Sequence, residues 1–162
     1  MAPVGYVAAL RSPEVSMTQE KPKGFDGKTY FTLDEIARML PSPARLMHEV
    51  GTRWWKVYYA AKVANWALAD YEIGEIEELI EICMHTRPKY AQYMEPFLDQ
   101  TLKPVQDALR AMDWAAFEAA YDQATKDAND YHKAAGKEIL VWKLPSTPPP
   151  DMVMEPQGSG SH

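Results

Sequence analysis

The chain has 162 residues, of which 46% are apolar and 25% are charged. This length and composition predict one soluble globular domain and exclude a disordered chain. With 17 lysines and arginines against 23 acidic residues, the net charge is −6, so we expect no nucleic-acid partner. Charges interrupt every hydrophobic run, and no membrane span is predicted.

The two ends of the chain carry few signals of regular structure. Residues 1–31 contain several prolines and glycines and follow neither a helical nor a strand period, so we predict an N-terminal arm. The start lacks the basic and apolar segments of a signal peptide, although a cleaved signal replaced by Met1 would leave the same sequence. Residues 158–162 are typical of a linker and the beginning of a histidine tag, so His162 is not a candidate metal ligand.

Two helix starts follow the arm. Thr32, with Glu35 three residues later, forms a capping box. It predicts a short helix that ends before the next proline and packs across the end of the main body. Ser42 followed by Pro43 predicts the first long helix, which we expect to end near Ala64.

The next segments predict three more helices. Asn65 can cap a second long helix that ends near Thr86. Two prolines lie within 90–112, so the third helix is expected in two pieces or with a kink. Asp113 caps the fourth helix, which Gly136 should end.

The fold class follows from this pattern of helices. Four amphipathic helices with short connections, and no alternating strand pattern, predict an all-α fold. The arrangement we expect is an antiparallel four-helix bundle over residues 32–145, which includes the short leading helix. Residues 138–144 are compatible with a short extended piece, and the proline-rich tail 146–157 predicts a strap along the bundle.

Metal chemistry has little support in this sequence. A di-iron site in a helical bundle needs Glu-x-x-His on two helices, and none of His48, His85 and His132 has a glutamate three residues before it. The single cysteine, Cys83, permits no disulfide, cysteine zinc site or covalently held haem. We therefore predict no metal site. Among the acidic residues of the second helix, Glu72 lies beside the apolar stripe and could point inward.

Aromatic residues are concentrated on the helices, and several must meet in the core. They can be packing residues, as large aromatic side chains usually are. They can also wall a cavity, since flat rigid rings around a centre leave a slot for a planar or cyclic ligand. On this second interpretation, the residues that bind the ligand are Trp54, Trp55, Tyr58, Tyr59, Glu72, Phe117 and Tyr121.

The candidate catalytic residues lie near the end of the last helix. Asp130, Tyr131 and His132 are consecutive. A carboxylate, a phenol and an imidazole at the mouth of a cavity can perform general acid–base chemistry near neutral pH. Such clusters also occur on helix surfaces by chance, so a structural role for His132 stays open.

The order of these residues resembles a known group of proteins. The resemblance covers about residues 43–145 and is carried by 55–62, 65–72, Glu75, Asp113, Phe117, Tyr121, Asn129, His132 and Gly136. These positions resemble the small periplasmic c-type cytochrome-like proteins with four helices, of the cytochrome c prime kind. The resemblance implies a four-helix fold and a periplasmic location.

One motif of that group is altered here. Its members carry Cys-x-x-Cys-His on the last helix, which attaches haem through two thioethers and binds the iron through the histidine. The same five positions, 128–132, read Ala-Asn-Asp-Tyr-His in this chain. Ala128 and Tyr131 replace the cysteines, while His132 remains. Covalent haem is therefore excluded, and the resemblance implies a pocket that once fitted a large flat ligand.

Three functions are consistent with these patterns. The first is a cofactor-independent lyase or isomerase acting on a small hydrophobic substrate, such as a terpenoid or aromatic compound, and an epoxide or a tertiary alcohol would suit it. There His132 or a neighbouring acid would protonate a leaving oxygen, and aromatic ring faces would stabilise positive charge. The second is non-covalent haem binding with His132 as axial ligand, and the third is a carrier of an apolar molecule. A homodimer is also expected, because bundles of this type often pair through an outer helix face.

Overall fold

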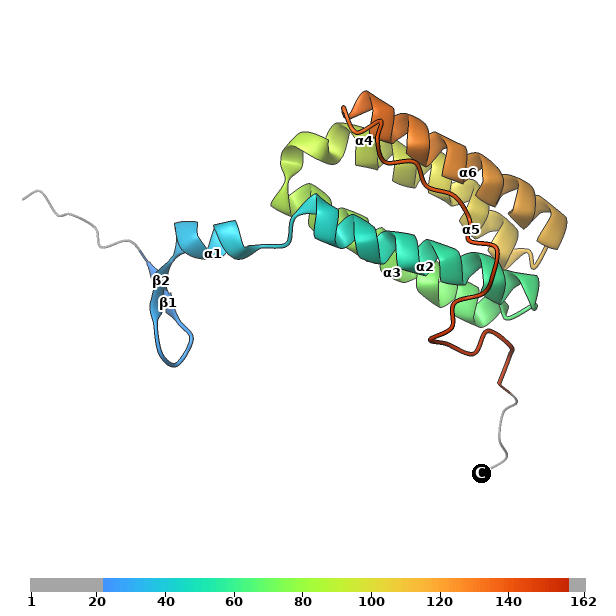
Figure 1. Ribbon diagram of the computed structural model, residues 1–162, viewed down its shortest axis with the longest axis horizontal. Coiled ribbons are helices and arrows are strands. Elements are labelled where there is room, and N and C mark those ends of the chain that lie inside the picture. Colours follow the sequence, from blue (N-terminus) through green and yellow to red (C-terminus); the bar gives the residue numbers. More distant parts are fainter. Residues whose placement is uncertain (1–21, 158–162) are drawn as a thin grey trace, which may run out of the picture. The chain divides into compact units, whose positions relative to one another are not determined.

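The computed structural model describes residues 22–157 (Figure 1). Residues 1–21, which hold most of the predicted arm, and the predicted linker and tag residues 158–162 lie outside the described part. The chain divides into two compact units, Met1–Met39 and Leu40–His162. The described residues are mostly helical, which confirms the predicted all-α class.

A hairpin and a short helix form the described part of the N-terminal unit. Strands β1 (Lys23–Phe25) and β2 (Tyr30–Thr32) pair in antiparallel fashion, and helix α1 (Leu33–Met39) follows directly. The predicted capping box is present: the Glu35 amide donates to Thr32 Oγ1 at 3.2 Å, and the Thr32 amide donates to the Glu35 carboxylate at 2.7 Å. The sequence did not indicate the hairpin, because strands of 3 residues are too short to show an alternating pattern.

Helix α1 belongs to this unit and not to the one that holds the long helices. It contacts β1 and β2, and a Cβ added at Gly24 would lie 3.0 Å from the Ile36 side chain. The predicted boundary at residue 32 placed the short helix in the bundle domain, whereas the observed division falls after Met39. The apolar face of this helix of 7 residues is used locally, against the hairpin, and none of its residues is fully buried.

Two long helices, α2 (Pro43–Lys62) and α3 (Trp66–Thr86), begin the helical unit, which we define as residues 40–157. A proline occupies the first turn of α2, where its missing amide hydrogen leaves no helical bond unmade. Asn65 caps α3 by accepting a hydrogen bond from the Leu68 amide at 3.3 Å. Both helices end close to their predicted limits, and their short connection makes them antiparallel neighbours.

The third segment is divided, as its prolines predict. It contains a 3₁₀ turn η1 (Pro88–Tyr90), helix α4 (Ala91–Pro96), a π-helical stretch η2 (Phe97–Leu102) and helix α5 (Lys103–Arg110). Pro96 is the last residue of α4. The change to π-helix occurs directly after it, because proline cannot donate to the regular helical ladder.

Helix α6 (Trp114–Ala134) has both of its predicted end signals. The Asp113 carboxylate accepts a hydrogen bond from an amide of the first turn at 3.0 Å. Past the other end, Gly136 has a φ of 68°, and the Lys137 amide donates to the His132 carbonyl at 2.7 Å. This glycine-dependent Schellman motif holds the chain after α6 next to the last helical turn.

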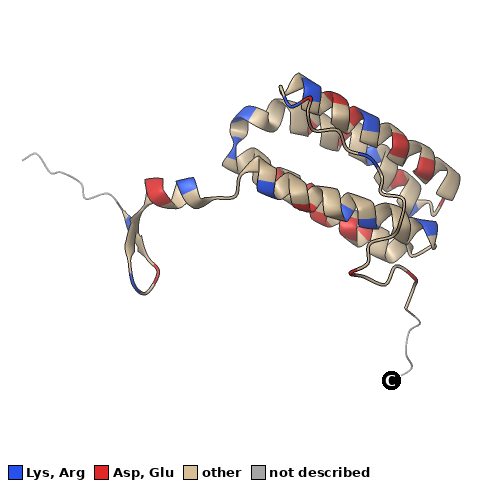
Figure 2. Cartoon of the chain, in the orientation of Figure 1, with Lys and Arg blue, Asp and Glu red and all other residues tan. Residues whose placement is uncertain are grey.

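The helices of the helical unit share one hydrophobic core. Helix α2 packs along α3 and α5 packs along α6, and the two pairs contact each other through α2 with α6 and α3 with α5 (Figure 1). Charged residues of both signs are distributed along the helices (Figure 2). No helix in residues 22–157 combines the length and the apolar composition that crossing a membrane requires.

The segment after α6 is held along the helical unit by side chains of α2 and of the α2–α3 connection. Trp55 Nε1 donates to the Thr147 carbonyl at 2.8 Å, and the Tyr59 hydroxyl donates to the Pro145 carbonyl at 2.9 Å. The predicted extended piece 138–144 pairs with no strand in the described residues.

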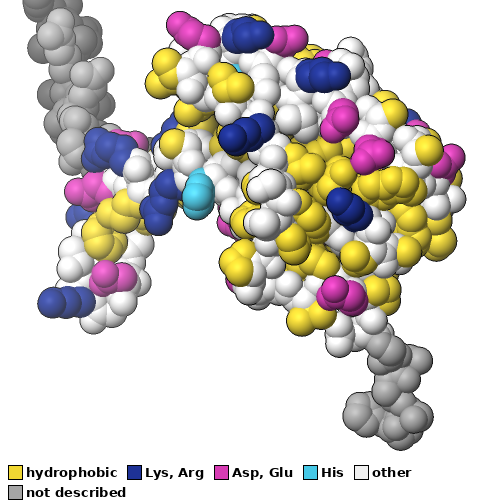
Figure 3. Space-filling view, turned by 45° about the vertical axis from the view of Figure 1, so that its right-hand side comes forward, with side chains coloured by type: hydrophobic (Ala, Val, Ile, Leu, Met, Phe, Trp, Pro, Cys, Tyr) yellow, Lys and Arg dark blue, Asp and Glu magenta, His cyan; other side chains and the backbone are white. Residues whose placement is uncertain are grey.

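Figure 3 shows hydrophobic side chains gathered on one face of the helical unit. The exposed hydrophobic residues of this unit include Val63, Met112, Met152 and Val153.

Candidate functional site

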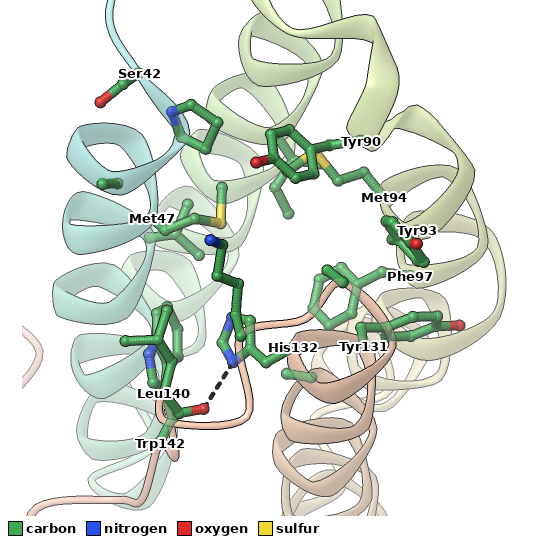
Figure 4. A pocket seen from close by; sticks show the side chains of 17 residues that line it. Ser42, Met47, Tyr90, Tyr93, Met94, Phe97, Tyr131, His132, Leu140 and Trp142 are labelled. Carbon is green, nitrogen blue, oxygen red and sulfur yellow. Dashed lines mark hydrogen bonds between the residues drawn. The ribbon is translucent and has the colours of Figure 1, made fainter.

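A pocket of about 450 Å³ opens between α2, the α4–η2 segment, α6 and the chain that follows α6 (Figure 4). This volume lies within the range of ordinary small-molecule sites. Its apolar lining includes Met47, Val50, Ile80, Met94, Phe97, Ala128, Leu140 and Trp142. Its polar groups belong to Ser42, Tyr90, Tyr93, Tyr131, His132 and Lys137. A mostly apolar cavity with a few polar groups is typical of a binding site for a small organic molecule.

Helical periodicity explains why α6 contributes as it does. Ala128, Tyr131, His132 and Ala135 line the pocket, and their spacing of three, four and seven residues places them on one face of a helix. The two alanines leave the space that the larger side chains border. Phe97, the first residue of η2, meets the Tyr131 ring edge to face with ring centroids 6.2 Å apart.

His132 has a defined orientation in this pocket. Its Nδ1 lies 3.1 Å from the Leu140 carbonyl oxygen (Figure 4). A carbonyl oxygen can only accept, so Nδ1 carries the hydrogen and Nε2 of the neutral ring carries the lone pair. No described group bonds to Nε2, and no side-chain nitrogen or oxygen of the described residues is both buried and unsatisfied. Nε2 is therefore accessible to a molecule in the pocket.

The protonation state of His132 follows from its surroundings. Burial lowers the pKa of the imidazole below 6.5, and the hydrogen bond to Leu140 opposes this effect only in part. Because the pKa is lowered, the ring is neutral at pH 7. A neutral imidazole with a free Nε2 can accept a proton or bind a metal centre, and it cannot donate a proton from Nε2.

The chain after α6 closes one side of the pocket. The Asn129 side chain makes two hydrogen bonds to the backbone of Trp142: its amide donates to the carbonyl at 2.9 Å, and its oxygen accepts from the N–H at 2.7 Å. The Trp142 ring lies 5.6 Å from the His132 ring, edge to face. A Cβ added at Gly51 would lie 3.1 Å from the same indole. Asn129 and Gly51 therefore position Trp142 beside His132.

Replacing Asn129 with alanine is expected to lower the free energy of unfolding by about 1–3 kcal/mol, because two partly buried hydrogen bonds are lost. Urea unfolding measures this value, and hydrogen exchange of the Trp142 amide should become faster. Gln123→Ala is the matched control, since Gln123 is exposed and its side chain bonds only to a carboxylate of the same helix, and it should change the stability by less than about 0.5 kcal/mol. An Asn129 variant as stable as this control would show that the segment is not held at this point.

The predicted catalytic residues are brought together only in part. His132 and Tyr131 line the pocket, but the Tyr131 hydroxyl points away from His132 (Figure 4). Asp130 does not line the pocket: it is exposed, and its carboxylate is 2.7 Å from Lys133 Nζ. Successive residues of a helix point about 100° apart, so three in a row cannot face one cavity. The predicted acid–base cluster is thus reduced to His132.

Four of the aromatic residues predicted to wall the cavity form a packed core instead. The Trp54 and Tyr121 rings stack with centroids 4.2 Å apart, and the Tyr121 hydroxyl donates to the Trp54 carbonyl at 2.9 Å. Tyr58 and Phe117 pack against Tyr121 with centroids 5.1 and 5.7 Å away. Burial raises the pKa of Tyr58 to about 12, and its hydrogen bond to Glu118 adds to this shift. None of these four residues lines the pocket.

The other three predicted ligand-binding residues also lie outside the pocket lining. Trp55 and Tyr59 hold the C-terminal segment, as described above. Glu72 does point inward and is only 1% exposed. Its carboxylate is 2.8 Å from the Arg53 guanidinium, which also contacts Glu75 at 3.1 Å. An ion pair therefore accounts for the buried charge.

Several lining residues were not among the sequence candidates. Tyr90, Tyr93, Met94 and Phe97 come from the proline-divided segment, and Trp142 comes from the tail. Only the two prolines indicated that this segment is irregular, and irregular or π-helical turns often occur at functional sites. Nothing in the local pattern indicated that the tail lies against His132.

Comparison with other proteins adds no further assignment. No protein-family model matches the chain, and no curated protein or solved structure is significantly similar to it. Within residues 22–157, no group of three or more histidine, cysteine, aspartate or glutamate side chains is placed to hold a metal ion. The features of this chain that indicate a function are therefore the pocket and His132.

Proposed function

We propose that the chain is a cofactor-independent lyase or isomerase that acts on a small, apolar, cyclic molecule in the pocket around His132. The observation that carries this proposal is the orientation of His132. Its Nδ1 is held by the Leu140 carbonyl, so the basic Nε2 is available in an apolar cavity. A base near its substrate, in surroundings that keep it neutral, is the requirement for abstracting a proton at pH 7.

The resemblance to the cytochrome c prime group is part of the proposal, and so is an antiparallel four-helix bundle. The positions of the haem-attachment motif support it: Ala128, Tyr131 and His132 all line one pocket. The pairing of α2 with α3 and of α5 with α6 agrees with that topology. On this proposal, a pocket that bound haem in a related protein binds a smaller ligand in this chain.

A proton transfer at carbon illustrates the chemistry. In the isomerisation of an epoxide to an allylic alcohol, Nε2 of His132 removes a proton from the carbon next to the epoxide ring. The electron pair of that C–H bond forms the C=C bond, and the C–O bond breaks. The oxygen takes a proton from solvent, and His132 returns its proton to solvent, so that the product is an isomer of the substrate.

The first experiment is incubation of the protein with limonene oxide and α-methylstyrene oxide, which both carry a C–H bond next to the epoxide ring. The products are analysed by gas chromatography and mass spectrometry. We expect the isomeric allylic alcohol from at least one epoxide. Binding of these compounds without any product would favour a carrier and would contradict the enzymatic proposal.

The pH dependence of the rate is a separate prediction. Unprotonated His132 is the active form, so kcat/KM should rise with pH through the pKa of this residue and then stay constant. Because burial lowers that pKa, the midpoint should fall below 6.5. A rate that falls as the pH rises from 5 to 7 would indicate that the active form of the protein carries a protonated catalytic group, which contradicts this prediction.

Non-covalent haem binding is the second candidate, and the same histidine favours it. Histidines that bind metals usually donate their other ring N–H to a carbonyl or carboxylate, as His132 does to Leu140. His132 Nε2 would be the axial ligand, and the apolar lining would hold the macrocycle. Titration with haemin distinguishes the two candidates: saturation of a Soret band at one equivalent, lost in a His132 variant, would support haem binding.

A further inference from the structure

The charge of the pocket is unusual for a protein with a net charge of −6. Lys137 alone carries a formal charge among the residues that line the pocket in the described part of the chain. No aspartate or glutamate lies in this lining. An apolar cavity whose lining includes one lysine and no carboxylate favours a ligand with an apolar body and a negative end.

The position of Lys137 is fixed by the end of α6. Its amide donates to the His132 carbonyl at 2.7 Å, in the turn for which Gly136 supplies a φ of 68°. The lysine therefore follows one turn after His132, at the same side of the pocket.

The ammonium group of Lys137 has no partner within residues 22–157. Lys133, one turn earlier, lies 2.7 Å from Asp130, and Lys56 lies 3.1 Å from Asp151. No carboxylate of the described residues lies within ion-pair distance of Lys137. An ion pair inside the protein therefore does not explain why a lysine borders this apolar pocket.

We infer that the ligand of this pocket carries a carboxylate, and that Lys137 is the residue that selects it. This inference rests on the proposed function, because it concerns the substrate of the same site. The apolar body of the ligand lies against residues such as Met47, Phe97 and Trp142, where burial stabilises it. The carboxylate stays at the exposed mouth beside Lys137. It keeps part of its hydration there, so the desolvation cost of binding is small.

A different role for Lys137 is the stabilisation of α6, since cations near a helix C-terminus interact favourably with its carbonyl groups. The two roles have different consequences. A helix-stabilising lysine changes the melting temperature and leaves the choice of ligand unchanged, whereas a ligand-selecting lysine changes the preference between charged and neutral ligands.

The test uses two probes of nearly equal shape, 4-isopropylbenzoate and the neutral 4-isopropylbenzamide, at pH 7.5. Isothermal titration calorimetry gives the Kd of each for the wild-type chain and for Lys137→Met. The wild type should bind the acid about three- to tenfold more tightly than the amide. Lys137→Met should remove this preference, and Lys137→Arg should restore most of it. Lys133→Met is the matched control and should keep the wild-type preference, because its ammonium does not line the pocket.

The outcomes separate this inference from the proposed function. Equal binding of the acid and the amide, or a preference that survives in Lys137→Met, would overturn the role of Lys137 while the pocket remained a ligand site. A preference for the acid without turnover of any epoxide would support Lys137 and contradict the enzymatic proposal. Binding of neither probe at 1 mM would overturn the selection of a carboxylate by Lys137, whereas the proposed function would still be decided by the turnover of the epoxides.

Discussion

Replacing His132 with glutamine is expected to lower kcat/KM for the converted epoxide by about 10²- to 10⁴-fold, which is the usual contribution of a general base. Glutamine has a reach similar to that of the imidazole Nε2, and its neutral amide fills much of the same space. It has no nitrogen lone pair that can accept a proton at neutral pH. The variant should therefore keep the shape of the pocket and lose the chemistry.

Two control variants show whether the loss of activity is specific to His132. His85→Gln changes an exposed histidine of α3 whose Nδ1 also bonds to a backbone carbonyl, that of Glu81 at 2.9 Å, but which does not line the pocket. Asp130→Asn removes the neighbouring carboxylate that faces away. Both should retain turnover within about twofold of the wild type. A His132→Gln chain with wild-type turnover and an unchanged far-UV circular dichroism spectrum would refute the assignment.

Replacing Phe117 with alanine is expected to lower the free energy of unfolding by about 3–5 kcal/mol. Phe117 is 0% exposed, and its ring contacts those of Tyr58, Trp66, Trp114 and Tyr121. Removing the ring therefore costs its transfer free energy and also leaves a cavity among side chains that stack on one another and cannot collapse freely. Urea unfolding followed by circular dichroism measures the change.

The same variant distinguishes a core residue from a pocket wall. Because Phe117 does not line the pocket, the folded variant should bind 4-isopropylbenzoate with nearly the wild-type Kd at a temperature well below its midpoint. Val63→Ala, at a side chain that is 36% exposed, is the control and should cost less than about 1 kcal/mol. Weaker ligand binding by Phe117→Ala with unchanged stability would place the aromatic cluster at the ligand site after all.

The limits of the helices were predictable because they depend on neighbours in the sequence. Asn65 and Asp113 cap the amides that follow them within a few residues, and such caps act locally. Gly136 ends α6 because glycine adopts a φ of 68° without the steric cost that a Cβ brings. The hairpin before α1 was not predicted, because its strands carry too few residues for a period.

The site was less predictable, because a pocket is a property of packing between distant segments. His132 and Tyr131 were identified from their spacing and from the haem-attachment positions. The sequence did not show which aromatic residues belong to the core and which line the pocket. The same ring can stack in a core or border a cavity, and its neighbours in the fold determine which of the two occurs. Trp142 contacts His132, but the chain between them is irregular. No periodicity in the sequence predicts the path of such a segment.

The role of His132 is tested most directly by its tautomeric state, measured by long-range ¹H–¹⁵N NMR correlation at pH 7 with and without 4-isopropylbenzoate. We expect a neutral ring with its hydrogen on Nδ1, because the Leu140 carbonyl accepts from that atom. We also expect the resonance of the unprotonated Nε2 to shift when the ligand enters the pocket. A ring with its hydrogen on Nε2, or an Nε2 resonance that does not respond to saturating ligand, would contradict the assignment of this pocket as the working site.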